Sequence, residues 1–172
     1  FANPFPFKML KINSFVFDFL TQTNNYKYIE QYGLQSFEVN VLDKTQTLIE
    51  KMVSLIRFSF DDNFIESLSK KIRHFYDLYF LLNDSDCRAF IYSNDFRKQF
   101  NTILQHDKDI FDIPKGWQNK LITDSPLVSD FETIWKQLKT KYQIELSVLA
   151  YRPIPNEASI AKSFIDLLKR IE

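Results

Sequence analysis

Apolar residues recur at helical spacing along most of this chain. Between Thr45 and Ile56 they lie three or four positions apart, which predicts a helix with one apolar face that ends near Phe58. Asp43 is a suitable N-cap for this helix, because Gln46 follows three positions later as in a capping box. Similar apolar stripes predict helices over 64–82, after Ser93 or Asn94, over 129–142, and from an Asn156 cap onward.

The pattern changes to a period of two at 37–42, where alternation of apolar and polar residues predicts a short strand. Before it, two prolines predict an extended start, followed by a short helix over 14–21 and one helical turn over 28–32. We expect a turn over 87–92 and a mixed loop over 117–129. The predicted fold is mainly α, of the α+β kind: a helical bundle with one or two short N-terminal strands.

The length of 172 residues fits a single domain or a fragment of a larger protein. Within it we expect residues 1–43 to form an extended segment with a short helix and a strand. Residues 44–172 should form a helical lobe. The chain begins with Phe1 rather than methionine, which is consistent with a fragment or a processed product.

The composition excludes several classes of protein. With only 2 Gly, a Gly-rich phosphate loop is excluded, and with 22 basic and 22 acidic residues the chain has no global basic field, although a local patch is allowed. The single Cys87 excludes an internal disulfide and a multi-cysteine zinc site, and indicates a reducing cytoplasm. No apolar run reaches membrane-spanning length, so we expect no membrane association.

A polar stripe crosses the apolar segment KIRHFYDLYFLL. Its members are spaced at i, i+3, i+4 and i+7 and are Lys70, Arg73, His74 and Asp77. An exposed pair of Asp77 with Arg73 would contribute only about 0.3–0.5 kcal/mol, too little to offset dehydration of a carboxylate. Asp77 is therefore expected either to belong to a polar network in the core or to face a cleft.

Other candidates have both a functional and a structural interpretation. Lys51 lies at the edge of the apolar stripe, where it could bind phosphate or could extend along the helix to water. His74 is more plausible as a hydrogen-bonding partner than as a general base. His74 and His106 are the only histidines and form no zinc motif, and the acidic pairs at 61–62 and 84–86 are explained by helix capping.

The segments TLIEKMVSLIRFSF and KIRHFYDLYFLL, with the preceding FEVNVL strand, resemble the central signature of the AbiEii/AbiGii abortive-infection nucleotidyltransferase toxins. The resemblance implies a minimal nucleotidyltransferase fold with a helical C-terminal lobe, acting on a nucleoside triphosphate with Mg²⁺. It implies that Lys51 contacts phosphate and that Asp77 assists the attacking hydroxyl or positions Lys51. Lys70, Arg73 and His74 would be substrate-binding residues.

The chain departs from the family pattern at two places. His74 stands where the family has an acid, and the family's Gly-Ser loop with its accompanying Asp-x-Asp pair is not in this sequence. They would precede Phe1, so we expect this chain alone to hold no metal and to be inactive.

The resemblance implies a bacterial, cytoplasmic toxin that transfers a nucleotide to an acceptor hydroxyl, such as one on RNA, and that has a cognate antitoxin. The alternative is a non-enzymatic helical module that binds a protein partner through an exposed aromatic face. An HEPN-like ribonuclease bundle is a weaker alternative, because the required Arg-to-His spacing is missing. Burial of the Asp77 stripe would favour the interaction module, and an open site with Lys51 close to Asp77 would favour the enzyme.

Overall fold

The computed structural model describes residues 7–150 and 153–171, which divide into two compact units. Unit 1 comprises Phe1–Asp43 and unit 2 comprises Lys44–Glu172. The predicted fold class is confirmed, since helices dominate the structure and a two-stranded sheet lies near the start.

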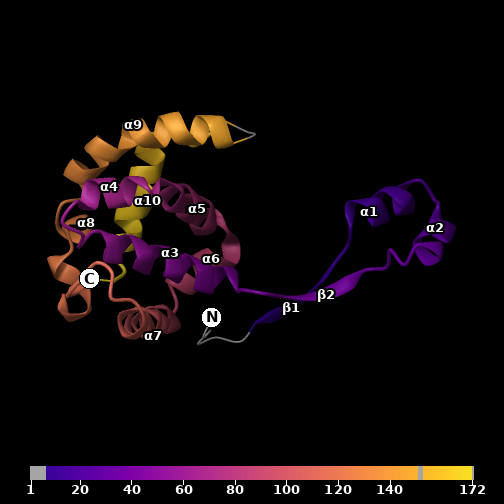
Figure 1. Cartoon of the computed structure of the whole chain (residues 1–172), viewed down its shortest axis with the longest axis horizontal. Coiled ribbons are helices and arrows are strands. Elements are labelled where there is room, and N and C mark those ends of the chain that lie inside the picture. Colours follow the sequence, from indigo (N-terminus) through magenta and orange to yellow (C-terminus); the bar gives the residue numbers. More distant parts are fainter. Residues whose placement is uncertain (1–6, 151–152, 172) are drawn as a thin grey trace. The chain divides into compact units, whose positions relative to one another are not determined.

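Unit 1 is a two-stranded antiparallel ribbon with two short helices inserted between its strands (Figure 1). Its elements are β1 (Lys8–Ile12), α1 (Phe15–Gln22), α2 (Tyr26–Gln31) and β2 (Phe37–Val41). The helix expected over 14–21 is α1, and its N-cap is Ser14, whose Oγ accepts a hydrogen bond from the backbone N–H of Phe17 at 3.0 Å. The predicted strand is β2. Its partner β1, which begins at Lys8, was not predicted separately, and the extended start expected before it lies mostly outside the described residues.

Unit 1 buries very little of its apolar surface. Among its described residues, Ile29 alone is buried, whereas the Phe15 side chain is 85% exposed. All five residues of β1 are exposed. Backbone pairing, rather than a core, therefore accounts for most of the order within this unit.

Unit 2 is a helical lobe in which α3 (Lys44–Phe58) is central. Around it lie α4 (Phe64–Ser69), α5 (Ile72–Asn83), α6 (Ser85–Ile91), α7 (Asp95–Ile110), α8 (Pro126–Ser129), α9 (Phe131–Leu149) and α10 (Glu157–Leu168). Helix α3 packs against α4, α5, α6, α7 and α8, and its apolar face is fully buried. The buried members of that face are those that the helical spacing predicts, including Leu48, Met52 and Ile56.

An aromatic cluster joins α5, α9 and α10. The ring of Phe75 lies 4.9 Å from that of Phe164 and 5.3 Å from that of Trp135, measured between centroids. Phe131 lies 4.8 Å from Phe164. Such tilted and edge-on contacts stabilise a core beyond simple area burial, so this cluster holds α5 rigidly in place.

The prediction of one continuous helix over 64–82 is wrong, because the structure has two helices there. Helix α4 ends at Ser69 and α5 begins at Ile72, because Lys71 leaves the helical region with φ −107° and ψ 14°. The break allows α4 to pack mainly against α9 while α5 packs mainly against α3 and α10. No proline or glycine marks this position, so the sequence contains no local signal for it.

Two other expectations are corrected. The turn expected over 87–92 is part of α6, which Asp84 caps by accepting hydrogen bonds from the N–H groups of Asp86 and Cys87 at 3.0 and 3.1 Å. The expected loop over 117–129 contains two 3₁₀ turns, Trp117–Asn119 and Ile122–Asp124, and α8. The Asn156 cap is confirmed, since its Oδ1 accepts from the N–H of Ser159 at 2.8 Å.

Candidate functional site

The structure joins the two residues that the sequence singled out most strongly. The Lys51 Nζ atom on α3 donates a hydrogen bond to Asp77 Oδ2 on α5 at 2.7 Å, across 26 positions of sequence. The side chains are 22% and 37% exposed, respectively. Neither is sealed in the core, so the pair lies at the edge of the α3–α5 contact.

The packing of α3 against α5 explains this geometry. Leu48 and Leu55, on either side of Lys51 along the helix face, are fully buried and anchor α3. On α5, Phe75 and Leu78 are buried and flank Asp77. The methylene stem of Lys51 therefore follows the helix contact, while its ammonium emerges where Asp77 meets solvent.

Asp77 does not pair with Arg73, the partner considered from helical spacing. Arg73 is exposed and forms no ion pair with any described residue. Asp77 pairs with Lys51 of α3 instead of with Arg73 of its own helix, because the packing of α5 on α3 brings the Lys51 ammonium within 2.7 Å of the carboxylate. A lysine contributed by another helix links two elements, which a pair within α5 would not do.

His74 lies beside the pair in a partly buried position. Burial, and after it the nearby positive charges of Lys51 and Lys71, lower its pKa to about 4. The Nδ1 atom is buried and has no hydrogen-bond partner among the described residues. The imidazole is therefore neutral at pH 7.

Lys70 does not join the pair. It follows α4 and forms an ion pair with Glu66 one turn back at 2.7 Å. The break between α4 and α5 interrupts the polar stripe. His74 and Asp77, on α5, lie near Lys51, whereas Lys70, at the end of α4, pairs with Glu66 of its own helix.

A second lysine of α3 forms a related but separate site. Lys44 Nζ lies 2.7 Å from carboxylate oxygens of both Asp84 and Asp86, and hydrogen bonds to these acids raise the lysine's pKa. Asp84 also caps α6. The sequence indicated a capping role for this acid but not the helix that it caps. Sequence reasoning did not find Lys44, because its partners lie 40 positions away.

Sequence reasoning also missed the charged contact between α3 and α7. Arg57 Nη1 lies 2.9 Å from Asp107 Oδ2, and both side chains are largely buried, at 11% and 18% exposed. The guanidinium lies 4.0 Å from the ring centroid of Phe111. The rings of Phe58 and Trp117 also lie near the guanidinium, at 5.0 and 5.8 Å, so we interpret this ion pair as structural.

Within the described ranges 7–150 and 153–171, no group of three or more histidine, cysteine, aspartate or glutamate side chains is arranged to hold a metal ion. The donor set around Lys51 and Asp77 offers one carboxylate and a neutral imidazole, which does not fit a Mg²⁺ site. Over the same ranges, no helix combines the length and apolar character needed to cross a membrane.

Comparison with protein families gives a match over most of the chain. The model of the family described as "Nucleotidyl transferase AbiEii toxin, Type IV TA system" matches residues 3–155. The match covers most of unit 1, the Lys51–Asp77 pair and unit 2 as far as Pro155, and it ends before α10. Searches of curated proteins and of solved structures gave no match.

Proposed function

This chain belongs to the AbiEii family of nucleotidyl transferase toxins of type IV toxin–antitoxin systems, and from that premise we propose that Lys51 and Asp77 serve nucleotide transfer. The proposed reaction moves a nucleotide from a nucleoside triphosphate to an acceptor hydroxyl, such as one on RNA. The observation that carries the proposal is the 2.7 Å contact between these two side chains on different helices.

The chemistry of the pair suits phosphate binding. Catalysis of phosphoryl and nucleotidyl transfer depends mainly on cations held in position against phosphate oxygens. The Lys51 ammonium has three donors, of which one is given to Asp77, so others remain for a phosphate. In this proposal Lys51 contacts the substrate, and Asp77 is a positioning residue that holds the ammonium.

The neighbouring candidates have more limited roles. Arg73 is exposed and free of an ion pair among the described residues, so it is available to a substrate phosphate. His74 is neutral and can exchange a hydrogen bond but cannot contribute charge. Lys70 is already paired with Glu66, which makes it the weakest of the proposed substrate contacts.

Mg²⁺ is expected from the family resemblance, but the described residues do not provide its ligands. We therefore assign no step of the reaction to a metal held by these residues. The contribution proposed for this lobe is binding and orientation of phosphate groups.

Transfer of labelled nucleotides from each of the four triphosphates to RNA, catalysed by the intact protein, tests the proposal. We expect Lys51→Ala to lower kcat/KM by about 100-fold, the size of effect seen when one electrostatic contact to a transition state is removed. Asp77→Asn should lower it less, by roughly 10-fold, because an amide oxygen still accepts a hydrogen bond from Lys51.

Lys44→Ala is the matched control. It removes another lysine–aspartate contact of the same helix and should leave kcat/KM within about 2-fold of the wild-type value. Thermal unfolding of all three variants separates loss of a substrate contact from loss of folding. The proposal is wrong if Lys51→Ala retains full activity, or if it and Lys44→Ala lose activity and stability equally.

One observation favours the second candidate, a non-enzymatic module that binds a protein. Unit 1 exposes large apolar side chains, among them Phe15 at 85%, Tyr32 at 64% and Met9 at 62%. The family description suggests a cognate antitoxin as a partner. Absence of transfer by the wild-type protein with any triphosphate would favour this candidate over the enzyme.

A further inference from the structure

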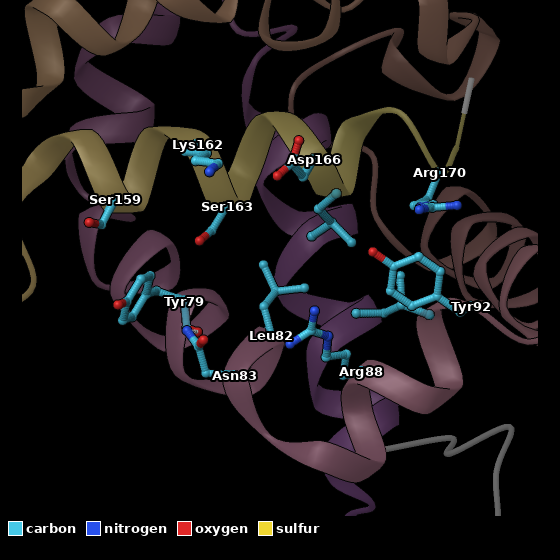
Figure 2. Close-up of a pocket in the computed structure, with 12 residues that line it drawn as sticks. Tyr79, Leu82, Asn83, Arg88, Tyr92, Ser159, Lys162, Ser163, Asp166 and Arg170 are labelled. Carbon is cyan, nitrogen blue, oxygen red and sulfur yellow. Dashed lines mark hydrogen bonds between the residues drawn. The ribbon is translucent and has the colours of Figure 1, made fainter.

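Helices α5, α6 and α10 line an open cavity of about 370 Å³ that neither Lys51 nor Asp77 lines (Figure 2). Its apolar lining comes from Leu82, Ile91 and Leu167. The last two are 6% and 1% exposed and belong to the packed core. The cavity therefore has a rigid floor, and its rim is formed by longer polar side chains.

Three cationic side chains line this cavity: Arg88 from α6, Lys162 from α10, and Arg170 from the turn that follows α10. The single carboxylate in the lining is Asp166, which faces Lys169 at 3.4 Å. The whole chain has a formal net charge of zero, so these cations form a local concentration of positive charge.

None of these three cations forms an ion pair with another residue in the part of the chain that the structure describes. The cations of α3 differ, because Lys44, Lys51 and Arg57 each contact a carboxylate. All three side chains are solvent-exposed and line the same cavity, so their donors remain available to an anion that binds there.

Hydrogen-bonding groups face the same space. In Figure 2, Ser163 points from α10 toward α5 and α6, and Arg88 extends from α6 toward α10. Ser159, Lys162, Ser163 and Asp166 share one side of α10 because they are spaced three or four positions apart. The Arg170 guanidinium lies 4.1 Å from the ring centroid of Tyr92, which restricts its motion.

We propose that this cavity binds phosphate groups of a nucleotide or an RNA strand through Arg88, Lys162 and Arg170. Lys162 lies about 9 Å along the axis of α10 from its last residue, Leu168, at 1.5 Å per residue, and Arg170 follows in the turn beyond it. That spread suits several phosphates better than one, and hydroxyl groups and guanidinium groups are common phosphate ligands. The site uses none of the residues assigned above to nucleotide transfer.

Binding is tested directly, with the intact protein, a fluorescein-labelled single-stranded RNA and ATP. We expect Arg88→Gln and Lys162→Gln each to weaken RNA binding by about tenfold, the effect of removing one charge-assisted contact. The slope of log affinity against log salt should fall by about 0.7 for each cation removed. Lys162→Arg keeps the charge and should keep the affinity.

Arg97→Gln and Lys136→Gln are matched controls, since both side chains are exposed and lie outside the cavity lining. Equal RNA affinity in the cavity and control variants overturns the proposal, as does failure of the wild-type protein to bind either RNA or ATP. Parallel weakening of ATP binding assigns the site to free nucleotide phosphates, and weakening confined to RNA assigns it to the phosphodiester chain. RNA and ATP binding are measured as equilibrium affinities. A protein that binds these ligands but catalyses no nucleotide transfer would therefore contradict the proposed function without contradicting the phosphate site.

Discussion

His74 lies one turn before Asp77 on α5, and its surroundings oppose the charged form of its ring. Burial has the largest effect on its pKa, followed by the positive charges of Lys51 and Lys71. The charge of Asp77 acts in the opposite direction but does not compensate. The neutral imidazole can therefore lie next to a lysine, where an imidazolium would repel it.

A pH dependence of stability follows from the lowered pKa. His74 titrates near 6.5 when unfolded and about 4 when folded, so the unfolded state gains a proton first as the pH falls. Stability should be lost between about pH 6.5 and 4. Because the ring is only partly buried, we expect a loss of roughly 1–2 kcal/mol.

Urea unfolding of the wild-type protein and of His74→Gln at several pH values measures this effect. The substitution keeps a polar side chain but removes the titration, so the difference in unfolding free energy between the two proteins should change over this range. A constant difference from pH 7 to pH 4 would contradict the assignment.

At the scale of elements, α3 is connected to three neighbouring helices by charged contacts. Lys44 contacts α6 and its cap, Lys51 contacts α5, and Arg57 contacts α7. The three differ in burial, and Arg57 is the most enclosed of them. Arg57 and Asp107 therefore matter most for stability, because breaking a buried pair leaves an uncompensated charge.

We expect Asp107→Asn to lower the free energy of unfolding by about 2 kcal/mol. The amide cannot neutralise Arg57, which would remain between aromatic rings without its anion. Asp109→Asn is the control, because this neighbouring carboxylate is exposed and should change stability by less than about 0.5 kcal/mol. Urea unfolding measures both variants, and equal values for the two would show that the α3–α7 pair contributes little.

At the scale of the whole molecule, the two units differ in how much they bury. Unit 1 has one buried residue among those described, whereas every apolar position on the inner face of α3 in unit 2 is buried. Local opening requires less energy where few apolar contacts are lost. The two units should therefore open with different free energies.

Hydrogen exchange measured by mass spectrometry should show this difference. We expect amides of β1 and β2 to exchange at least about 100-fold faster than those of α3, because their ladder covers no packed core. Amides of α5 provide a second reference within unit 2. Protection of the β1–β2 ladder equal to that of α3 would show that unit 1 is stabilised by contacts beyond its own core.

The period of apolar residues in the sequence predicted those helices that bury an apolar face in the core of unit 2. The α3 helix ends at Phe58, as predicted, and α10 follows the Asn156 cap, because stripe and cap are local properties of consecutive residues. The division of 64–82 into α4 and α5 was not predictable in this way. The division depends on tertiary packing: α4, with Leu68, packs mainly against α9, whereas Phe75 of α5 contacts Phe164 of α10. Both of these partner helices come later in the chain.

The sequence by itself thus determined the helical class, a capping role for Asp84 although not the helix that it caps, and the presence of an acid at Asp77 that needed a partner. Only the tertiary structure decided that this partner is Lys51 rather than Arg73, and that Arg88, Lys162 and Arg170 line one cavity. The physical reason is distance along the chain. Spacing of three or four residues specifies which side chains share a helix face, whereas contacts between helices depend on how their apolar faces pack together.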